Sequence, residues 1–200
     1  MLFAVLLLQT PLQAATYKID ADHSSVTFKI RHLFSKVQGT FREYQGTLDY
    51  EPGKPETWKT EAAIQTASID TGVKERDTHL RSADFFDADK YPTITFKSAD
   101  ITDATAEGAK LNGVLNMHGV EKPVALDLEI HGEGTDPWGN VRAGFTATCK
   151  VNRKDFGIVW NEKLETGQVL LGEDVEITLE IEAIKQGAAG KAEVEKQEEQ

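Results

Sequence analysis

Apolar and polar residues alternate one by one along much of this chain of 200 residues. In the segment 173–184, for example, Val175, Ile177 and Leu179 alternate with Glu or Thr. Successive side chains of a β-strand point to opposite faces of the sheet, so a period of two indicates strands with one buried and one solvated face. The pattern predicts an all-β fold, and it covers 24–33, 37–50, 57–70, 92–103, 109–117, 123–131, 141–151 and 173–184.

Turn-forming residues separate these stretches, for instance Pro52-Gly53 and the segment 136–139 (Asp-Pro-Trp-Gly). Within 37–50 the apolar set changes from odd to even positions, which predicts a bulge near Arg42-Glu43. Bulges bend strands, and a sheet that closes on itself needs bends. Eight antiparallel strands of this kind form either a closed barrel or a sandwich.

Residues 72–90 break the alternation and predict a short helix followed by a loop. Glu75 and His79 stand four residues apart, as do Asp77 and Arg81, so each pair can meet on one helix face. We expect three apolar side chains to fasten this insertion to the domain, namely Leu80, Phe85 and Phe86.

The insertion also holds a dense polar group made of Arg76, Asp77, His79 and Arg81. One interpretation is a head-group or catalytic site. The favoured one is structural: Asp77 pairs with Arg81, and His79 bonds backbone carbonyls near the barrel end. Buried charges need partners in either case, and the segment around Arg153 and Asp155 is a candidate to approach this group.

Composition excludes several classes of function. The chain has 22 basic and 33 acidic side chains, a formal net charge of −11, which argues against a nucleic-acid partner and against docking on an anionic membrane by charge. Its single cysteine, Cys149, excludes an internal disulfide and a zinc site with several Cys ligands. The five histidines show no metal-ligand spacing, and no catalytic motif is present. We therefore expect a protein that is not an enzyme, with no catalytic residue, no metal and no cofactor.

The two ends differ from the middle of the chain. Residues 1–14 contain an uncharged apolar run, Leu2 to Leu8, followed by Pro11, which predicts a signal peptide and hence a periplasmic or secreted protein. The run is too short for a membrane-spanning helix, which needs about 20 residues, so no integral membrane segment is expected. Residues 186–200 are almost without apolar side chains and predict a disordered acidic tail. The domain then spans 15–185.

Several longer motifs resemble the YceI-like family. They are ADHSSVTFKIRHL (21–33), RDTHLRSADFF (76–86), GVLNMHGVEKPVAL (113–126) and NRKDFGI (152–158), and the similarity extends over nearly all of 16–184. The resemblance implies a lipocalin-like antiparallel barrel that encloses a long isoprenoid or a related amphiphilic lipid. It also implies export to the periplasm, and it makes a homodimer plausible.

The alternation alone fits a barrel filled by its own side chains as well as a hollow one; the resemblance favours the hollow barrel. We expect its inward side chains to bind the lipid, namely Phe28, Ile30, Phe41, Ile64, Phe96, Leu115, Leu126, Leu128, Phe145 and Ile177. The leading hypothesis is an exported protein that encloses an isoprenoid, quinone-like or fatty-acyl lipid for transport, storage or stress protection. The alternatives are an enzyme or redox accessory acting on such a lipid, and a structural stress protein with a filled barrel.

Overall fold

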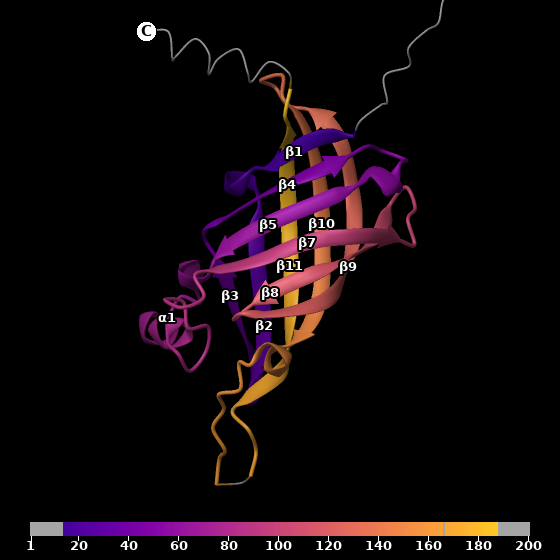
Figure 1. Cartoon of the computed structure of the whole chain (residues 1–200). Helices are drawn as coiled ribbons and strands as arrows, with labels where there is room; N and C mark the ends of the chain where they lie inside the picture. Colours follow the sequence, from indigo (N-terminus) through magenta and orange to yellow (C-terminus); the bar gives the residue numbers. More distant parts are fainter. Residues whose placement is uncertain (1–13, 166, 188–200) are drawn as a thin grey trace, which may run out of the picture.

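A computed structural model describes residues 14–165 and 167–187 of the chain (Figure 1). These residues form a single antiparallel sheet, one α-helix and short 3-10 turns. The helix is α1 (Lys74–Arg81), and the 3-10 turns are η1 (Ala21–His23), η2 (Pro55–Thr57), η3 (Thr66–Ser68) and η4 (Arg153–Phe156). The strands are β1 (Ala15–Ile19), β2 (Ser25–His32), β3 (Ser35–Phe41), β4 (Tyr44–Tyr50), β5 (Lys59–Gln65), β6 (Ile69–Asp70), β7 (Thr93–Thr102), β8 (Gly108–Met117), β9 (Val120–Thr135), β10 (Val141–Asn152) and β11 (Leu171–Lys185).

The sheet closes into a barrel. Its closed ring runs β1-β4-β5-β7-β8-β9-β10-β11, and β11 pairs back with β1 from Ala183↔Ile19 to Lys185↔Tyr17. Every neighbouring pair in this ring is antiparallel. The predicted eight-stranded antiparallel barrel is confirmed, and the sandwich alternative is wrong.

Strand β11 is long enough to change partner along its length. Its first part pairs with β2, which pairs with β3, and its last residues pair with β1. In Figure 1, β1 lies toward the upper end of the molecule and α1 lies beside the lower part. We refer to these as the β1 end and the α1 end.

The strand boundaries agree with the alternation in most places. The predicted bulge near Arg42-Glu43 corresponds to the break between β3 and β4. Strand β1 was not expected, because five residues hold too few repeats to reveal a period. Strand β9 extends to Thr135, beyond the predicted 131, because its pairing with β10 continues through a segment with two glycines and no alternation.

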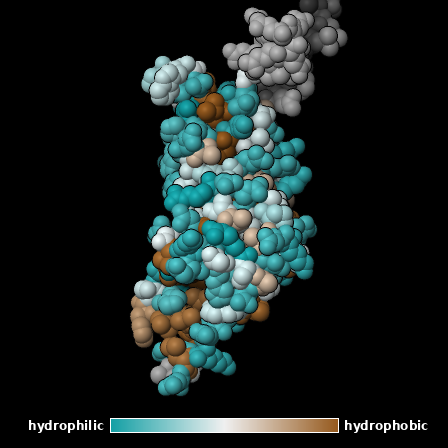
Figure 2. Space-filling view, turned by 90° about the vertical axis from the view of Figure 1, so that its left-hand side faces the viewer, coloured by the Kyte–Doolittle hydropathy of each residue, from teal (hydrophilic) through white to brown (hydrophobic). Residues whose placement is uncertain are grey.

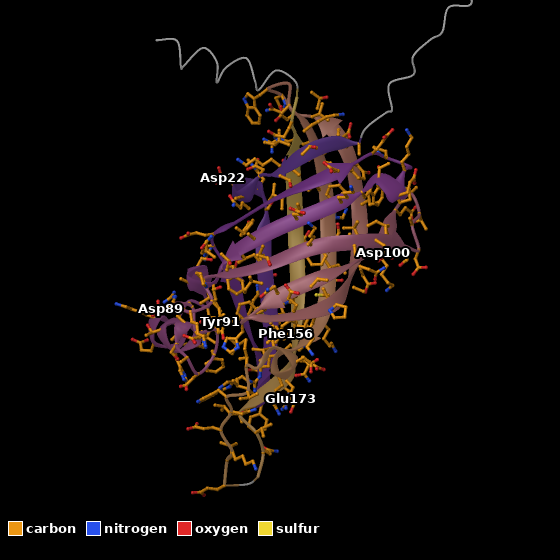
Figure 3. The ribbon with its side chains drawn as sticks, viewed as in Figure 1. Asp22, Asp89, Tyr91, Asp100, Phe156 and Glu173 are labelled. Carbon is orange, nitrogen blue, oxygen red and sulfur yellow. The ribbon has the colours of Figure 1, made fainter. Side chains whose placement is uncertain are left out.

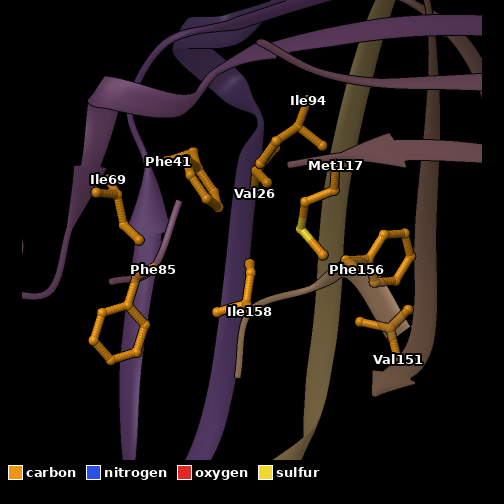
Figure 4. Packing of buried hydrophobic residues seen from close by; sticks show 9 residues of the cluster. All are labelled: Val26, Phe41, Ile69, Phe85, Ile94, Met117, Val151, Phe156 and Ile158. Carbon is orange, nitrogen blue, oxygen red and sulfur yellow. The ribbon is translucent and has the colours of Figure 1, made fainter. Parts of the chain in front are cut away.

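The predicted helix and loop are confirmed, since α1 occupies 74–81 within the expected insertion 72–90. Phe85 is a buried member of the main core cluster, and Leu80 and Phe86 pack against that cluster, as expected. The Phe86 ring meets Phe41 of β3 edge to face, with centroids 5.8 Å apart. Figure 4 shows Phe85 beside Ile69 and Ile158, on the same side of the cluster as Phe41. The insertion is thus fixed to the barrel by apolar packing.

The predicted signal peptide (1–14) and acidic tail (186–200) lie outside the described residues, apart from Ala14, Gln186 and Gly187. Within the described residues, no helix is both long and apolar enough to span a bilayer.

Candidate functional site: a cavity inside the barrel

The interior of the barrel is hollow. A cavity of about 590 Å³ runs within it, and its walls are formed mainly by apolar side chains from strands on all sides. Ligand-binding cavities in proteins measure about 300–1,000 Å³, so this volume suits a small or chain-like molecule. The alternative of a barrel filled by its own side chains is therefore wrong.

All ten side chains expected to bind a ligand lie on the wall of this cavity. They come from eight different strands. The alternation of apolar and polar residues alone therefore predicted side chains that share one cavity wall. That they contact a ligand stays a prediction. The ten are Phe28, Ile30, Phe41, Ile64, Phe96, Leu115, Leu126, Leu128, Phe145 and Ile177.

Sequence reasoning missed the aromatic residues near the two ends of the cavity. Trp58 precedes β5 and packs against Tyr50, with centroids 5.0 Å apart, and Trp160 lies between η4 and β11. Both line the cavity. Trp58 lies at the edge of the alternating stretch 57–70 and just outside β5, and Trp160 lies in no alternating stretch.

Glycines preserve the open volume. The Phe28 ring of β2 lies over Gly39 of β3, and the Phe96 ring of β7 lies over Gly113 of β8. A Cβ atom at either glycine would come within 2.5 Å of the facing ring. Each ring therefore lies partly over a glycine of the neighbouring strand, in space that a side chain there would fill. This leaves more of the middle of the barrel open.

Three rings pack together at the α1 end. The His79 ring packs edge to face on Phe85 and on Trp160, with centroids 5.0 and 4.9 Å apart. Its Nε2 lies 2.9 Å from a carboxylate oxygen of Asp84. The prediction that His79 bonds backbone carbonyls was wrong, because the nearby acid in the same loop offers a stronger partner. The ring forms part of the cavity wall at this end.

The other polar residues of the insertion hold it in place, although not through the expected pair. Asp77 is buried and accepts hydrogen bonds from the backbone N–H and the hydroxyl of Thr71, at 2.9 and 2.6 Å. Arg76 donates to the same hydroxyl and to the Thr71 carbonyl. Arg81 donates to the carbonyls of Ala67 and Ile69. The predicted Asp77–Arg81 pair was wrong, but the structural interpretation of this group is supported.

Arg153 is the most deeply buried cation of the cavity wall, with 3% of its surface exposed. Its Nε donates to the Gly172 carbonyl at 2.9 Å, and its Nη1 donates to the Ile158 carbonyl at 2.8 Å. Burial lowers the pKa of Arg153, and the charge of Glu173 opposes that shift. The segment that follows Arg153 does approach the insertion, since Trp160 packs on His79, but the hydrogen bonds of Arg153 itself go to these two carbonyls and not to the polar group.

Cys149 faces the cavity, on the same side of β10 as Phe145. Burial, assisted by the negative charge of Asp127, raises the pKa of this thiol to about 11. A thiol in this state is protonated at neutral pH and is a poor nucleophile. Cys149 therefore acts as a small apolar side chain of the wall.

The charged group at the β1 end is structural. Arg142 donates to Asp20, Asp136 and Glu182 at distances of 2.5–2.7 Å. Asp20, His23 and Glu182 lie close enough together to suggest a metal site. However, the Arg142 guanidinium already bonds both carboxylates of that set.

The α1 end also carries apolar surface on its outside. Figure 2 shows hydrophobic residues gathered in the lower part of the molecule, on the side of α1. Phe34 is 90% exposed in the β2–β3 turn, and Val159 and Val169 are exposed in the segment between η4 and β11. These segments form the lower end of the molecule in Figure 1.

A closed antiparallel barrel around an apolar cavity places the protein among the lipocalin-like barrels. The chain belongs to the YceI-like family, because the model of the YceI-like domain matches residues 17–183. A UPF0312 protein of Pseudomonas putida is 39% identical over 193 residues, which cover 92% of this chain and 97% of that relative.

Solved structures show the same fold. The YceI protein of Campylobacter jejuni has a TM-score of 0.68 at 34% identity, covering 80% of this chain and 91% of its own. BcnA of Burkholderia cenocepacia has a TM-score of 0.73 at 22% identity, with 82% and 98% covered. A polyisoprenoid-binding domain from Saccharophagus degradans has a TM-score of 0.64 at 15% identity, with 87% and 100% covered.

Proposed function

We propose that this protein binds a long-chain lipid, of isoprenoid, quinone-like or fatty-acyl type, inside its barrel. The observation that carries the proposal is the apolar cavity of about 590 Å³. The fold shared with a polyisoprenoid-binding domain gives it further support. Burial of a chain contributes about 0.8 kcal/mol for each CH₂ removed from water, so an apolar cavity binds a long tail with few polar contacts.

The proposed activity is binding rather than catalysis. Three of the polar side chains on the wall are accounted for: Arg76 donates to Thr71, His79 bonds Asp84, and Cys149 is protonated at neutral pH. A general base or nucleophile needs a pKa near the working pH and a free lone pair. The proposal therefore favours a carrier or store of lipid over an enzyme or redox accessory.

We also propose that the protein works outside the cytoplasm, in the periplasm or as a secreted protein. The apolar run of residues 2–8 followed by Pro11 supports this location. Transport of a lipid between membranes through water is a task that an apolar cavity inside a barrel suits.

Native mass spectrometry of protein purified from its host tests the proposal. We expect an additional mass that organic extraction removes and that matches a lipid. Cys149→Trp places a large ring in the cavity and should abolish this mass. Lys150→Trp places the same ring at the next position of β10, where the side chain is exposed, and should retain it.

A wild-type protein that never carries a lipid would contradict the proposal if it also fails to take up the neutral apolar dye N-phenyl-1-naphthylamine. Equal retention of lipid by the two tryptophan variants, with both folded by circular dichroism, would show that the lipid binds elsewhere.

A further inference from the structure

One buried cation on the cavity wall has an unused hydrogen-bond donor. The Arg153 Nη2 atom is enclosed and has no hydrogen-bond partner among the described residues, although Nε and Nη1 each bond a carbonyl. Enclosed polar atoms of charged groups are rarely left without a partner, because the loss of hydration costs free energy.

The positive charge of Arg153 has no carboxylate in direct contact among the described residues, although the charge of Glu173 acts on it from farther away. No salt bridge to Arg153 occurs in the described parts of the chain, and Glu173 is bound by the neighbouring Lys154 at 2.5 Å. The two carbonyls that accept from Arg153 are neutral. A buried charge in this state gains most from a partner that brings a negative charge with it.

The position of Arg153 defines one end of the cavity. It begins η4, whose Phe156 lies toward the lower end of the molecule in Figure 3, as does Glu173 of β11. Arg76 and His79 line the cavity at this same α1 end. The opposite end is lined by aromatic residues, among them Tyr50, Trp58 and Phe145. The α1 end of the wall therefore carries the guanidinium groups of Arg76 and Arg153 together with the carboxylate of Glu75, whereas the β1 end is mainly aromatic.

We propose that Arg153 binds an anionic oxygen, carboxylate or phosphate, on the head group of the lipid. The tail then extends toward Tyr50 and Phe145 at the β1 end. This inference rests on the proposed lipid-binding function and specifies it: the ligand is an amphiphile with an acidic head, not a neutral oil. Nε and Nη1 are each occupied by a carbonyl, so Nη2 is the nitrogen of this side chain that is left to donate to the head group.

Displacement of N-phenyl-1-naphthylamine measures the contribution of the head group, because this probe is uncharged. The competitors are palmitate, geranylgeranyl phosphate, and the neutral analogues methyl palmitate and geranylgeraniol. We expect the wild type to bind at least one acid about 10- to 100-fold more tightly than its neutral analogue, the range for a charge-assisted hydrogen bond. The pair that shows the preference identifies carboxylate or phosphate as the source of the oxygen.

In Arg153→Met this preference should fall to less than about threefold, while affinity for the neutral analogues stays within about twofold. Arg42→Met removes a guanidinium on the exposed surface, where it pairs with Asp70, and should keep the full preference. Because Arg153→Met loses two bonds to carbonyls, Arg153→Lys provides a second variant. It keeps the charge without the fixed guanidinium geometry, and should retain part of the preference.

Equal affinity of the wild type for acids and neutral analogues would overturn the inference while leaving lipid binding intact. The same holds if the preference survives in folded Arg153→Met or Arg153→Lys at the wild-type level. Failure of the wild type to bind the dye and all four competitors would instead contradict the proposed function itself.

Discussion

At the scale of single residues, the environment of Cys149 determines its chemistry. Burial raises the pKa of the thiol to about 11. We expect alkylation by iodoacetamide at pH 8 to be about 100-fold slower than for an exposed thiol, because the thiolate reacts and the thiol does not. The rate is measured by mass spectrometry of the intact protein.

The exposed reference is Lys150→Cys in a Cys149→Ser background, which places a thiol on the outer face of β10. Similar rates for Cys149 and for this reference would show that the cavity admits water and reagent freely to the thiol. In that case Cys149 would not be shielded from solvent by the apolar side chains of the wall.

Asp77 provides a second prediction at this scale. Asp77→Ala leaves the backbone N–H and the hydroxyl of Thr71 without their shared acceptor. We expect the free energy of unfolding in urea to fall by about 1–3 kcal/mol, the cost of unsatisfied buried donors. Affinity for the neutral lipid analogues should stay within about twofold, because Asp77 holds the insertion rather than the ligand.

A loss of lipid affinity in Asp77→Ala without a loss of stability would contradict this role. Asp84→Ala gives a comparison in the same loop. It removes an exposed carboxylate that bonds His79, so its effect on stability should be smaller.

At the residue scale, the sequence predicted which side chains point into the barrel, but it did not predict the hydrogen-bond partners of the polar side chains. The period of two placed Phe28, Leu128 and Ile177 on the cavity wall, because alternation is a local property of the strand. Arg81 instead bonds carbonyls 14 and 12 residues earlier in the chain, which no local spacing indicates. The helix spacing of Asp77 and Arg81 allows the two side chains to meet. In the structure Asp77 binds Thr71 instead, and Arg81 binds these carbonyls.

At the scale of elements, the β2–β3 hairpin depends on the absence of a side chain at Gly39. A Cβ atom there would lie 2.4 Å from Cζ of Phe28 and 2.9 Å from Cγ2 of Thr71. We expect Gly39→Ala to reduce the free energy of unfolding by about 1–3 kcal/mol through overpacking. It should also weaken binding of the neutral dye, because Phe28 has to move on the cavity wall.

Gly134→Ala is the matched control. Gly134 also lies in a strand, β9, but no atom lies within 4 Å of the position where its Cβ would stand. Its substitution should leave stability within about 0.5 kcal/mol, as for surface changes in general. Equal stability of the two alanine variants would show that Phe28 has another place for its ring.

The elements were predictable where the pattern was long and were missed where it was short. The alternation identified β10 and the last part of β11 almost to the residue, because each holds several repeats. It missed β1, although this five-residue strand closes the ring by pairing with both β4 and β11. Closure of the ring depends on which strands pair in the assembled sheet. The sequence of a five-residue strand does not show these pairings.

At the scale of the whole molecule, Arg142 joins segments that are distant along the chain. It lies in β10 and bonds Asp20 beside η1, Asp136 in the β9–β10 turn and Glu182 in β11. Asp20 directly follows β1, and Glu182 lies just before the β11 residues that pair with β1. The group therefore stabilises the β1 end at the point where the ring closes.

This arrangement makes the stability of the barrel sensitive to acid. Burial raises the pKa of Asp136, but hydrogen bonds from Arg142 and Asn140 outweigh this effect and leave its pKa below the ordinary range. The bond from Arg142 lowers the pKa of Asp20 as well. Both carboxylates favour the folded state in their ionised form. Their contribution is complete above the unfolded pKa of about 4 and is lost as the pH falls through the folded values.

We therefore expect the melting temperature to fall between pH 5 and pH 2, and part of this fall to depend on Asp136. Asp136→Asn keeps the shape of the side chain but removes its charge, so it should melt below the wild type at pH 7 and approach it as the pH falls, since protonation then removes the same charge from the wild type. Exposed Asp89→Asn should keep the wild-type profile. A constant difference in melting temperature between Asp136→Asn and the wild type across this range would show that the ion pairs with Arg142 do not hold the barrel closed.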